Sequence, residues 1–217
     1  VLSVSFNKLL WPIYILGGFQ SLAYSSFFIL IVPLSSVIWP NEPFHAFEMS
    51  LIITIMLWTS SISGIVFGRL IDKHSRKRIL VLISFFRAAC LILLSFVPEG
   101  LGFQTWIYFF ILTLIFAIFA GGSYPAIVSL AYDTVRKEER SQFFGIFGVI
   151  NSIFTLFGFL ISGYLVQENF WRINFLMIGL AILLAGFNVN FIIKEPKRGI
   201  QNEELKDVLK YDSVEYN

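Results

Sequence analysis

Six long apolar stretches, separated by short polar breaks, constrain this chain more than any other feature of its sequence. About 20 apolar residues are needed for a helix to cross the hydrocarbon core of a bilayer. Each stretch has about that length or slightly more, and charged or proline-containing segments separate them. The expected helices cover residues about 11–33, 49–67, 79–97, 106–131, 143–166 and 173–193. The sequence therefore predicts an all-α membrane protein with six transmembrane helices.

Composition supports a membrane protein and excludes several other classes. The 217 residues are 57% hydrophobic and only 14% charged, whereas soluble proteins average roughly 25% charged residues. Cys90 is the only cysteine, which rules out an intramolecular disulfide, and His45 and His74 are too few for a histidine metal site. We therefore expect the lipid bilayer and a small molecule as partners, and no metal, cofactor or nucleic acid.

Lysine and arginine are distributed unevenly over the predicted connections. Fourteen of the 16 fall at the N-terminus, at 69–78, at 136–140 or beyond residue 193, all on one side of a six-helix bundle. The other side holds Arg172 together with four glutamates. Positively charged connections stay in the cytoplasm. Both termini are therefore expected there, with the protein in the cell membrane.

One cation, Arg87, falls within a predicted transmembrane helix. A charge at that depth costs about 2.5–3.5 kcal/mol on insertion scales, so it needs a partner or must reach the membrane surface. Two interpretations remain open. Arg87 could contact a substrate or a proton, or its head could extend back to lipid phosphates or to Asp133; we favour the second.

Polar side chains within the predicted helices are candidates for a water-filled cavity. Amide and indole groups need a hydrogen-bond partner in lipid, so they either line such a cavity or bond between helices. Small residues at four-residue intervals, as in Ser60-Gly64-Gly68, are more commonly used for close helix packing. The cavity candidates are Tyr14, Gln20, Tyr24, Trp58, Tyr124 and Asn151.

The sequence also contains an internal repeat. Residues 68–74 align with residues 163–169, and Lys77 then aligns with Arg172. Each copy joins the second helix of a three-helix unit to the third, but the two connections lie on opposite sides of the membrane. We therefore predict two inverted three-helix repeats, an organisation that is typical of secondary transporters.

The first copy of this repeat resembles a signature of the major facilitator superfamily. That family carries Gly-x-Leu-x-Asp-[Arg/Lys]-x-Gly-[Arg/Lys]-[Arg/Lys] between its second and third helices. The sequence here reads Gly68-Arg69-Leu70-Ile71-Asp72-Lys73-His74-Ser75-Arg76-Lys77, with Ser75 in place of the second glycine. The run that begins at Glu195-Pro196 is similar to the start of the family's central linker, notably in Spinster-like members; drug-efflux-like members are also close. The chain thus resembles the N-terminal half of such a transporter.

The resemblance implies roles for four residues at the cytoplasmic side. Asp72 would face the positive end of a helix from the second half of the transporter, an attraction that breaks when the protein opens inward. Arg76 would join Asp72 and Asp133 in a charge cluster, and Gly68 would permit close helix contact. The alternative is a connection whose cations merely fix orientation.

Two departures from the family pattern bear on coupling. Many proton-coupled members carry an arginine in the fourth helix, but residues 114–120 hold no charge, and no carboxylate occurs in any predicted helix. Proton coupling through this part of the protein therefore lacks an evident carrier. The coupling group would lie in the missing half, or the protein is a uniporter.

We expect residues 1–193 to form the transmembrane bundle and residues 194–217 to form a cytoplasmic linker. Six helices are half of a twelve-helix transporter, which works by alternating access. The chain would be a fragment, a split gene product or one half of a homodimer, and its function the secondary active or facilitative transport of a small organic solute. The alternatives are a membrane subunit without a substrate and an intramembrane enzyme with Ser123 as nucleophile. The enzyme is disfavoured because both histidines lie in loops.

Overall fold

The computed structural model describes residues 10–195, and within that range the protein is all-helical, as predicted. Residues 196–217 of the predicted linker, 194–217, lie outside the described residues, as do Lys8 and all the cations of the linker except Lys194. A short 3-10 helix, η1 (Lys137–Glu139), precedes α5. The six helices are α1 (Trp11–Ile38), α2 (Ala46–Lys73), α3 (Arg76–Leu94), α4 (Phe103–Thr134), α5 (Arg140–Gln167) and α6 (Trp171–Ile192).

Most helices extend beyond their predicted bounds. Helices α1, α2 and α5 each contain 28 residues, which corresponds to about 42 Å, whereas the hydrocarbon core is only about 30 Å thick. The prediction that the first helix ends at residue 33 was wrong, because α1 continues through Pro33. Membrane helices tolerate proline inside them. The polar ends of the long helices therefore extend beyond the hydrocarbon core.

Helix α3 begins three residues earlier than predicted. The side chain of Ser75 caps it by accepting a hydrogen bond from the backbone N–H of Arg78 at 3.2 Å, and serine is a favoured residue at this position. The residue that departs from the family signature thus has a local structural role. As a result, the cations at 76–78 belong to the first turn of α3 and not to the preceding loop.

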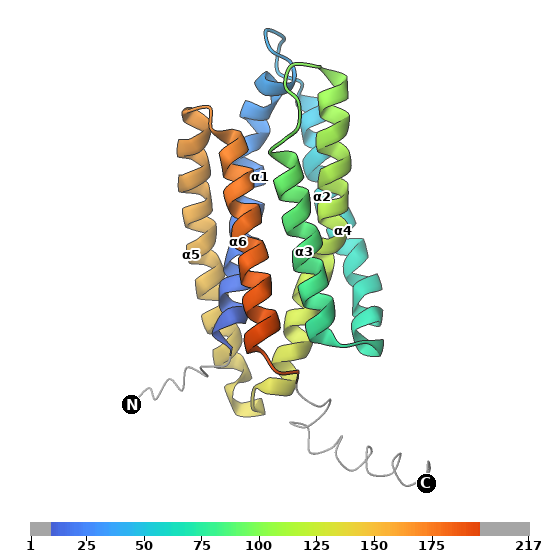
Figure 1. Ribbon diagram of the computed structural model, residues 1–217, viewed down its shortest axis with the longest axis vertical. Coiled ribbons are helices and arrows are strands. Elements are labelled where there is room, and N and C mark those ends of the chain that lie inside the picture. The colour runs from blue at the N-terminus through green and yellow to red at the C-terminus, as the bar shows by residue number, and fades with distance from the viewer. Residues whose placement is uncertain (1–9, 196–217) are drawn as a thin grey trace.

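Five of the six helices are long and apolar enough to cross a membrane on length and composition alone: α1, α2, α4, α5 and α6. Helix α3 is the exception, because its 19 residues include the three cations at 76–78 as well as Arg87. It nevertheless lies within the bundle and packs against α4 and α6 (Figure 1).

The helix packing repeats after three helices. Helix α2 packs mainly on α4, and α5 packs in the same way on α1, while α3 and α6 pack on each other. Exchanging the first three helices for the last three reproduces these pairs. The α2–α3 connection lies at the lower end of the bundle and the α5–α6 connection at the upper end (Figure 1). The two triplets therefore have the inverted arrangement that the internal repeat predicted.

Glycines allow the closest helix contacts in both equivalent interfaces. A Cβ at Gly121 of α4 would collide with the carbonyl oxygen of Ser60 on α2. A Cβ at Gly158 of α5 would collide with the hydroxyl of Ser25 on α1. The packing predicted for the Ser60-Gly64-Gly68 line is confirmed for Ser60 and Gly64, which face α4. A Cβ at Gly68, in contrast, would meet nothing within 4 Å.

The upper end of the bundle is held together by backbone and side-chain hydrogen bonds between loops. Arg172, at the start of α6, forms an ion pair with Glu99 at 2.9 Å. It also donates to the carbonyl oxygens of Ser95 and Val97 at 3.3 and 3.0 Å. The N–H of Gly102 bonds to the carbonyl oxygen of Ile38 at 3.1 Å. These contacts connect the loops at that end to one another.

Candidate functional site

A cluster of charged side chains lies at the lower end of the bundle. Arg76, at the start of α3, forms an ion pair with Asp133 near the end of α4, and their side chains are only 13% and 11% exposed. The structure thus brings together two of the residues that the family resemblance placed in a charge cluster. Asp72 and Gly68 lie at the same end, in the last turns of α2. Their role in gating stays a prediction.

Glu195 completes this cluster, although the sequence reasoning did not include it. Its carboxylate accepts a hydrogen bond from the hydroxyl of Ser75 and another from the backbone N–H of Arg76 at 2.7 Å. Helix N-termini attract negative groups because their N–H dipoles point outward. The available signal was an acidic residue directly after α6, at the same end of the bundle as the start of α3.

A cavity of about 210 Å³, lined by both polar and apolar residues, lies deeper in the bundle. Helices α1, α3, α4 and α5 all contribute to its lining. The polar residues that matter most for its chemistry are Gln20, Tyr24, Arg87, Ser123, Tyr124 and Asn151. A concave site with a few converging polar groups is the usual form of a small-molecule site. We refer to it below as the central pocket.

Four of the six predicted cavity residues line the central pocket, and two lie elsewhere. Gln20, Tyr24, Tyr124 and Asn151 are brought together there. Tyr14 is instead buried in aromatic packing, with its ring centroid 5.1 Å from that of Phe143 and 6.4 Å from that of Phe147.

Trp58 is the other predicted residue that the structure keeps away from the pocket. Its side chain is 68% exposed on α2. The face of α2 that packs inward carries Ser63 and Phe67 instead. A role for Tyr14 and Trp58 in substrate binding therefore has no geometric support at this pocket.

Arg87 is fully buried and faces the interior of the bundle. Its Nη1 donates to the hydroxyl oxygen of Ser123 at 3.1 Å. Its guanidinium carbon lies 4.7 Å from the ring centroid of Phe116 and 5.6 Å from that of Tyr24. Our favoured expectation, a side chain extended to lipid phosphates or to Asp133, was wrong. Asp133 pairs with Arg76 instead, and the Arg87 Cα lies about 16 Å along the helix from the start of α3.

Several polar atoms around the central pocket have no hydrogen-bond partner among the described residues. They are Nε and Nη2 of Arg87, Nε2 of Gln20 and Oδ1 of Asn151. Buried polar groups are normally satisfied, and each exception calls for an explanation. Three of these four atoms are donors. A solute that reached these buried atoms could accept hydrogen bonds from the three donors.

Ser123 lacks the surroundings of a catalytic nucleophile. Activation of a serine requires a neighbouring base, but the nearest polar partner of Ser123 is the Arg87 guanidinium, which only donates. His45 lies in the α1–α2 connection and pairs with Glu42 at 3.0 Å. Residues 10–195 also contain no group of three His, Cys, Asp or Glu that could hold a metal ion.

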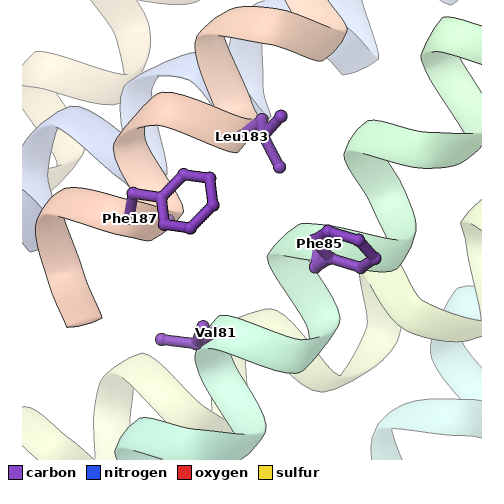
Figure 2. Close-up of a pocket in the computed structure, with 5 residues that line it drawn as sticks. Val81, Phe85, Leu183 and Phe187 are labelled. Carbon is purple, nitrogen blue, oxygen red and sulfur yellow. The ribbon is translucent and has the colours of Figure 1, made fainter.

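A second hollow, between α3 and α6, differs from the central pocket in size and chemistry (Figure 2). Val81 and Phe85 of α3 face Leu183 and Phe187 of α6 across it. Its volume of about 20 Å³ leaves space for about one water molecule, and its lining side chains are apolar. The hollow is a gap between side chains on an apolar surface and not a solute site.

Comparison with protein-family models identifies the family of this chain. The Major Facilitator Superfamily model matches residues 10–211. No curated protein matches the sequence. The match spans nearly all of the chain and covers the six-helix bundle, the charge cluster and the central pocket. The chain therefore belongs to the Major Facilitator Superfamily and is a multi-pass membrane transporter protein.

Proposed function

We propose that this chain is one six-helix half of a twelve-helix transporter that moves a small organic solute by alternating access. The central pocket is the single observation that carries this proposal. It brings an arginine, amides and hydroxyl groups from four helices together around one cavity inside the bundle. Transporters bind their substrates between helices. A subunit without a substrate would have no use for such groups.

A second six-helix half is proposed because α2 and α5 are the least covered helices. In the most apolar window of each, only 17% of α2 and 11% of α5 is buried, compared with 50% for α1. The two helices occupy equivalent positions in the two triplets. A second bundle packed against them would cover both exposed faces and close the central pocket on its open side. The second half could belong to the same gene, to a separate chain or to a second copy of this chain.

We further propose that the charge cluster acts as the cytoplasmic gate. The Arg76–Asp133 pair and the Glu195 contacts join α3, α4 and the segment after α6 at one end of the bundle. Asp72 and Gly68 would face the second half there. The contact of Asp72 with the second half would hold that end closed and would break when it opens, while the pairs within this bundle would keep its own end rigid. In this proposal the bundle spans the cell membrane, and the lower end of the bundle in Figure 1 faces the cytoplasm. The likeness to Spinster-like or drug-efflux-like members stays a proposal.

Accessibility of the central pocket from each side of the membrane tests the proposed function without knowledge of the substrate. The variant is Asn151→Cys in a Cys90→Ser background, in the complete protein reconstituted in vesicles. An alternating-access transporter exposes this position to an impermeant thiol reagent added on either side. A subunit that does not transport exposes it on one side or on neither, which would contradict the proposal. Lys137→Cys, outside the pocket, is the control and should react from one side only.

A further inference from the structure

We propose that the solute taken up by the central pocket is a small organic anion, whose carboxylate binds to Arg87 with further hydrogen bonds from Gln20 and Ser123. This inference rests on the proposed function, because it names the chemical class of the transported solute. The family assignment does not determine that class. Four features of the protein favour an anion: the charge of the pocket, its unsatisfied donors, the residue that replaces Arg87 in the second triplet, and the size of the pocket.

The charge of the central pocket is positive and uncompensated. Arg87 is fully buried, and the other described residues that line the pocket include no aspartate, glutamate or lysine. Burying a charge without a counter-charge is costly. The faces of Phe116 and Tyr24 attract the guanidinium, but aromatic faces compensate a cation less completely than a carboxylate does. The site therefore favours a ligand with a negative charge.

The unsatisfied atoms of the pocket are mainly donors. Nε and Nη2 of Arg87 and Nε2 of Gln20 make no hydrogen bond within the described residues. Ser123 accepts from Arg87, so its own hydroxyl proton is free to point elsewhere. An ionised carboxylate accepts hydrogen bonds and donates none, and it matches the forked geometry of a guanidinium. A cationic or donor-rich solute would leave these groups unpaired.

The second triplet shows that the fold does not require an arginine at this place. The internal repeat relates residues 95 positions apart, because Gly68 aligns with Gly163 and Lys77 with Arg172. Helices α3 and α6 both begin in register with this offset, at Arg76 and Trp171. The counterpart of Arg87 is then Ile182, which is fully buried. An apolar side chain can therefore fill this position in the helix packing. We infer that the arginine serves a purpose other than packing.

The size and lining of the pocket limit the anion further. A volume of about 210 Å³ accommodates a small organic acid and is below the range of typical drug-sized sites. The rings of Tyr24, Tyr124 and Phe147 form part of the wall. The apolar part of the anion would lie against these rings while its carboxylate contacts Arg87.

Thermal unfolding of the complete purified protein with two matched probes tests this inference. Sodium benzoate and benzamide share a ring and nearly the same shape but differ in charge. We expect saturating benzoate to raise the unfolding temperature by about 4 °C, and benzamide to leave it unchanged. Arg87→Gln should abolish the benzoate effect, and Arg87→Lys should keep part of it. Lys137→Gln, which removes an exposed cation outside the pocket, should keep the whole effect.

Two outcomes would overturn the inference. One is an equal response to benzoate and benzamide in the unmodified protein, as expected if an acidic side chain of the second half already occupies the site. The other is a benzoate effect that survives Arg87→Gln. If Arg87→Gln does not fold, protection of Asn151→Cys from the thiol reagent replaces it, and benzoate but not benzamide should slow that labelling. Two-sided labelling without anion protection would contradict only this inference, whereas one-sided labelling would contradict the proposed transport.

Discussion

The two three-helix units of this protein share their packing but differ in their chemistry. Helices α2 and α5 occupy equivalent places, and so do α3 and α6. Yet α3 carries Arg87 where α6 carries Ile182. Packing between the helices requires a side chain of suitable volume, and both residues meet that requirement. It does not require a charge. The difference teaches that the first unit carries chemistry that its fold does not demand.

The connections between the second and third helices of each unit show the same contrast. Arg76 and Asp133 form the ion pair at one connection, and their side chains are 13% and 11% exposed. Arg172 and Glu99 form the pair at the other, and theirs are 41% and 51% exposed. Burial decides how much stability is lost when one partner of an ion pair is removed. Water screens an exposed pair and solvates the partner that remains, whereas a buried partner is left without a counter-charge.

The largest effect is expected from removing one partner of the buried pair. Asp133→Ala removes a carboxylate that pairs with the Arg76 guanidinium in a mostly buried place. We expect the free energy of unfolding to fall by about 3 kcal/mol, the lower end of the range for such a change. Unfolding of the purified protein in mixed micelles measures it. The double variant Arg76→Ala/Asp133→Ala should lose less than the two single variants combined, and a fully additive loss would show that the pair does not interact.

A comparable effect is expected where α2 and α4 make their closest contact. A Cβ at Gly121 would meet the backbone of α2 at Ser60, which cannot move as a side chain can. We expect Gly121→Ala to lower the free energy of unfolding by about 2–3 kcal/mol. Gly163→Ala is the control, because a Cβ there meets nothing within 4 Å. Equal stability of the two variants in the same mixed-micelle assay would contradict the packing described here.

Replacing Arg87 by its counterpart should have a smaller effect, and of the opposite sign. Arg87→Ile removes an uncompensated charge from the interior, and we expect the free energy of unfolding to rise by about 1–2 kcal/mol. The anion effect should disappear in the same variant. The mirror variant Ile182→Arg should fail to fold. A clear loss of stability in Arg87→Ile would mean that the arginine serves the fold, which would remove the contrast between the two units.

The smallest effect is expected at the exposed pair. Glu99→Ala removes the carboxylate that accepts from Arg172 at 2.9 Å, while the backbone contacts of Arg172 remain. The free energy of unfolding should change by less than about 1 kcal/mol. Thermal unfolding at low and at high salt tests this, since screening should reduce the difference further. A loss as large as that of Asp133→Ala would contradict the role assigned to burial.

The number of helices and their inverted arrangement could be predicted from the sequence, because apolar segment length and the similarity between residues 68–77 and 163–172 are both visible in the sequence itself. Helix ends were predicted less well. The hydropathy of the sequence changes at the cations of 76–78, but the Ser75 cap places them inside α3. Pro33 has the properties of a helix end, yet packing and lipid allow α1 to continue. Hydropathy reports where a segment enters lipid, which differs from where its backbone stops being helical.

The central pocket could be predicted only in part. Gln20 and Asn151 were found because amides in lipid need partners, and the structure brings both to the pocket. Trp58 was predicted by the same rule but faces outward, because periodicity groups residues on a face without saying which neighbour that face meets. The inward direction of Arg87 and the contact of Glu195 with α3 depend on tertiary packing, which no local pattern of residues encodes.

The most direct test of the account is which side of the membrane each end of the bundle faces. The inverted units require the α1–α2 loop and the α4–α5 connection to lie on opposite sides. Glu42→Cys and Lys137→Cys, both exposed, can be labelled with an impermeant maleimide in intact cells and in inverted vesicles, each in a Cys90→Ser background. We predict that Glu42→Cys reacts only from outside and Lys137→Cys only from the cytoplasm. Labelling of both from the same side would contradict the six-helix bundle with inverted units, and with it the proposed transporter.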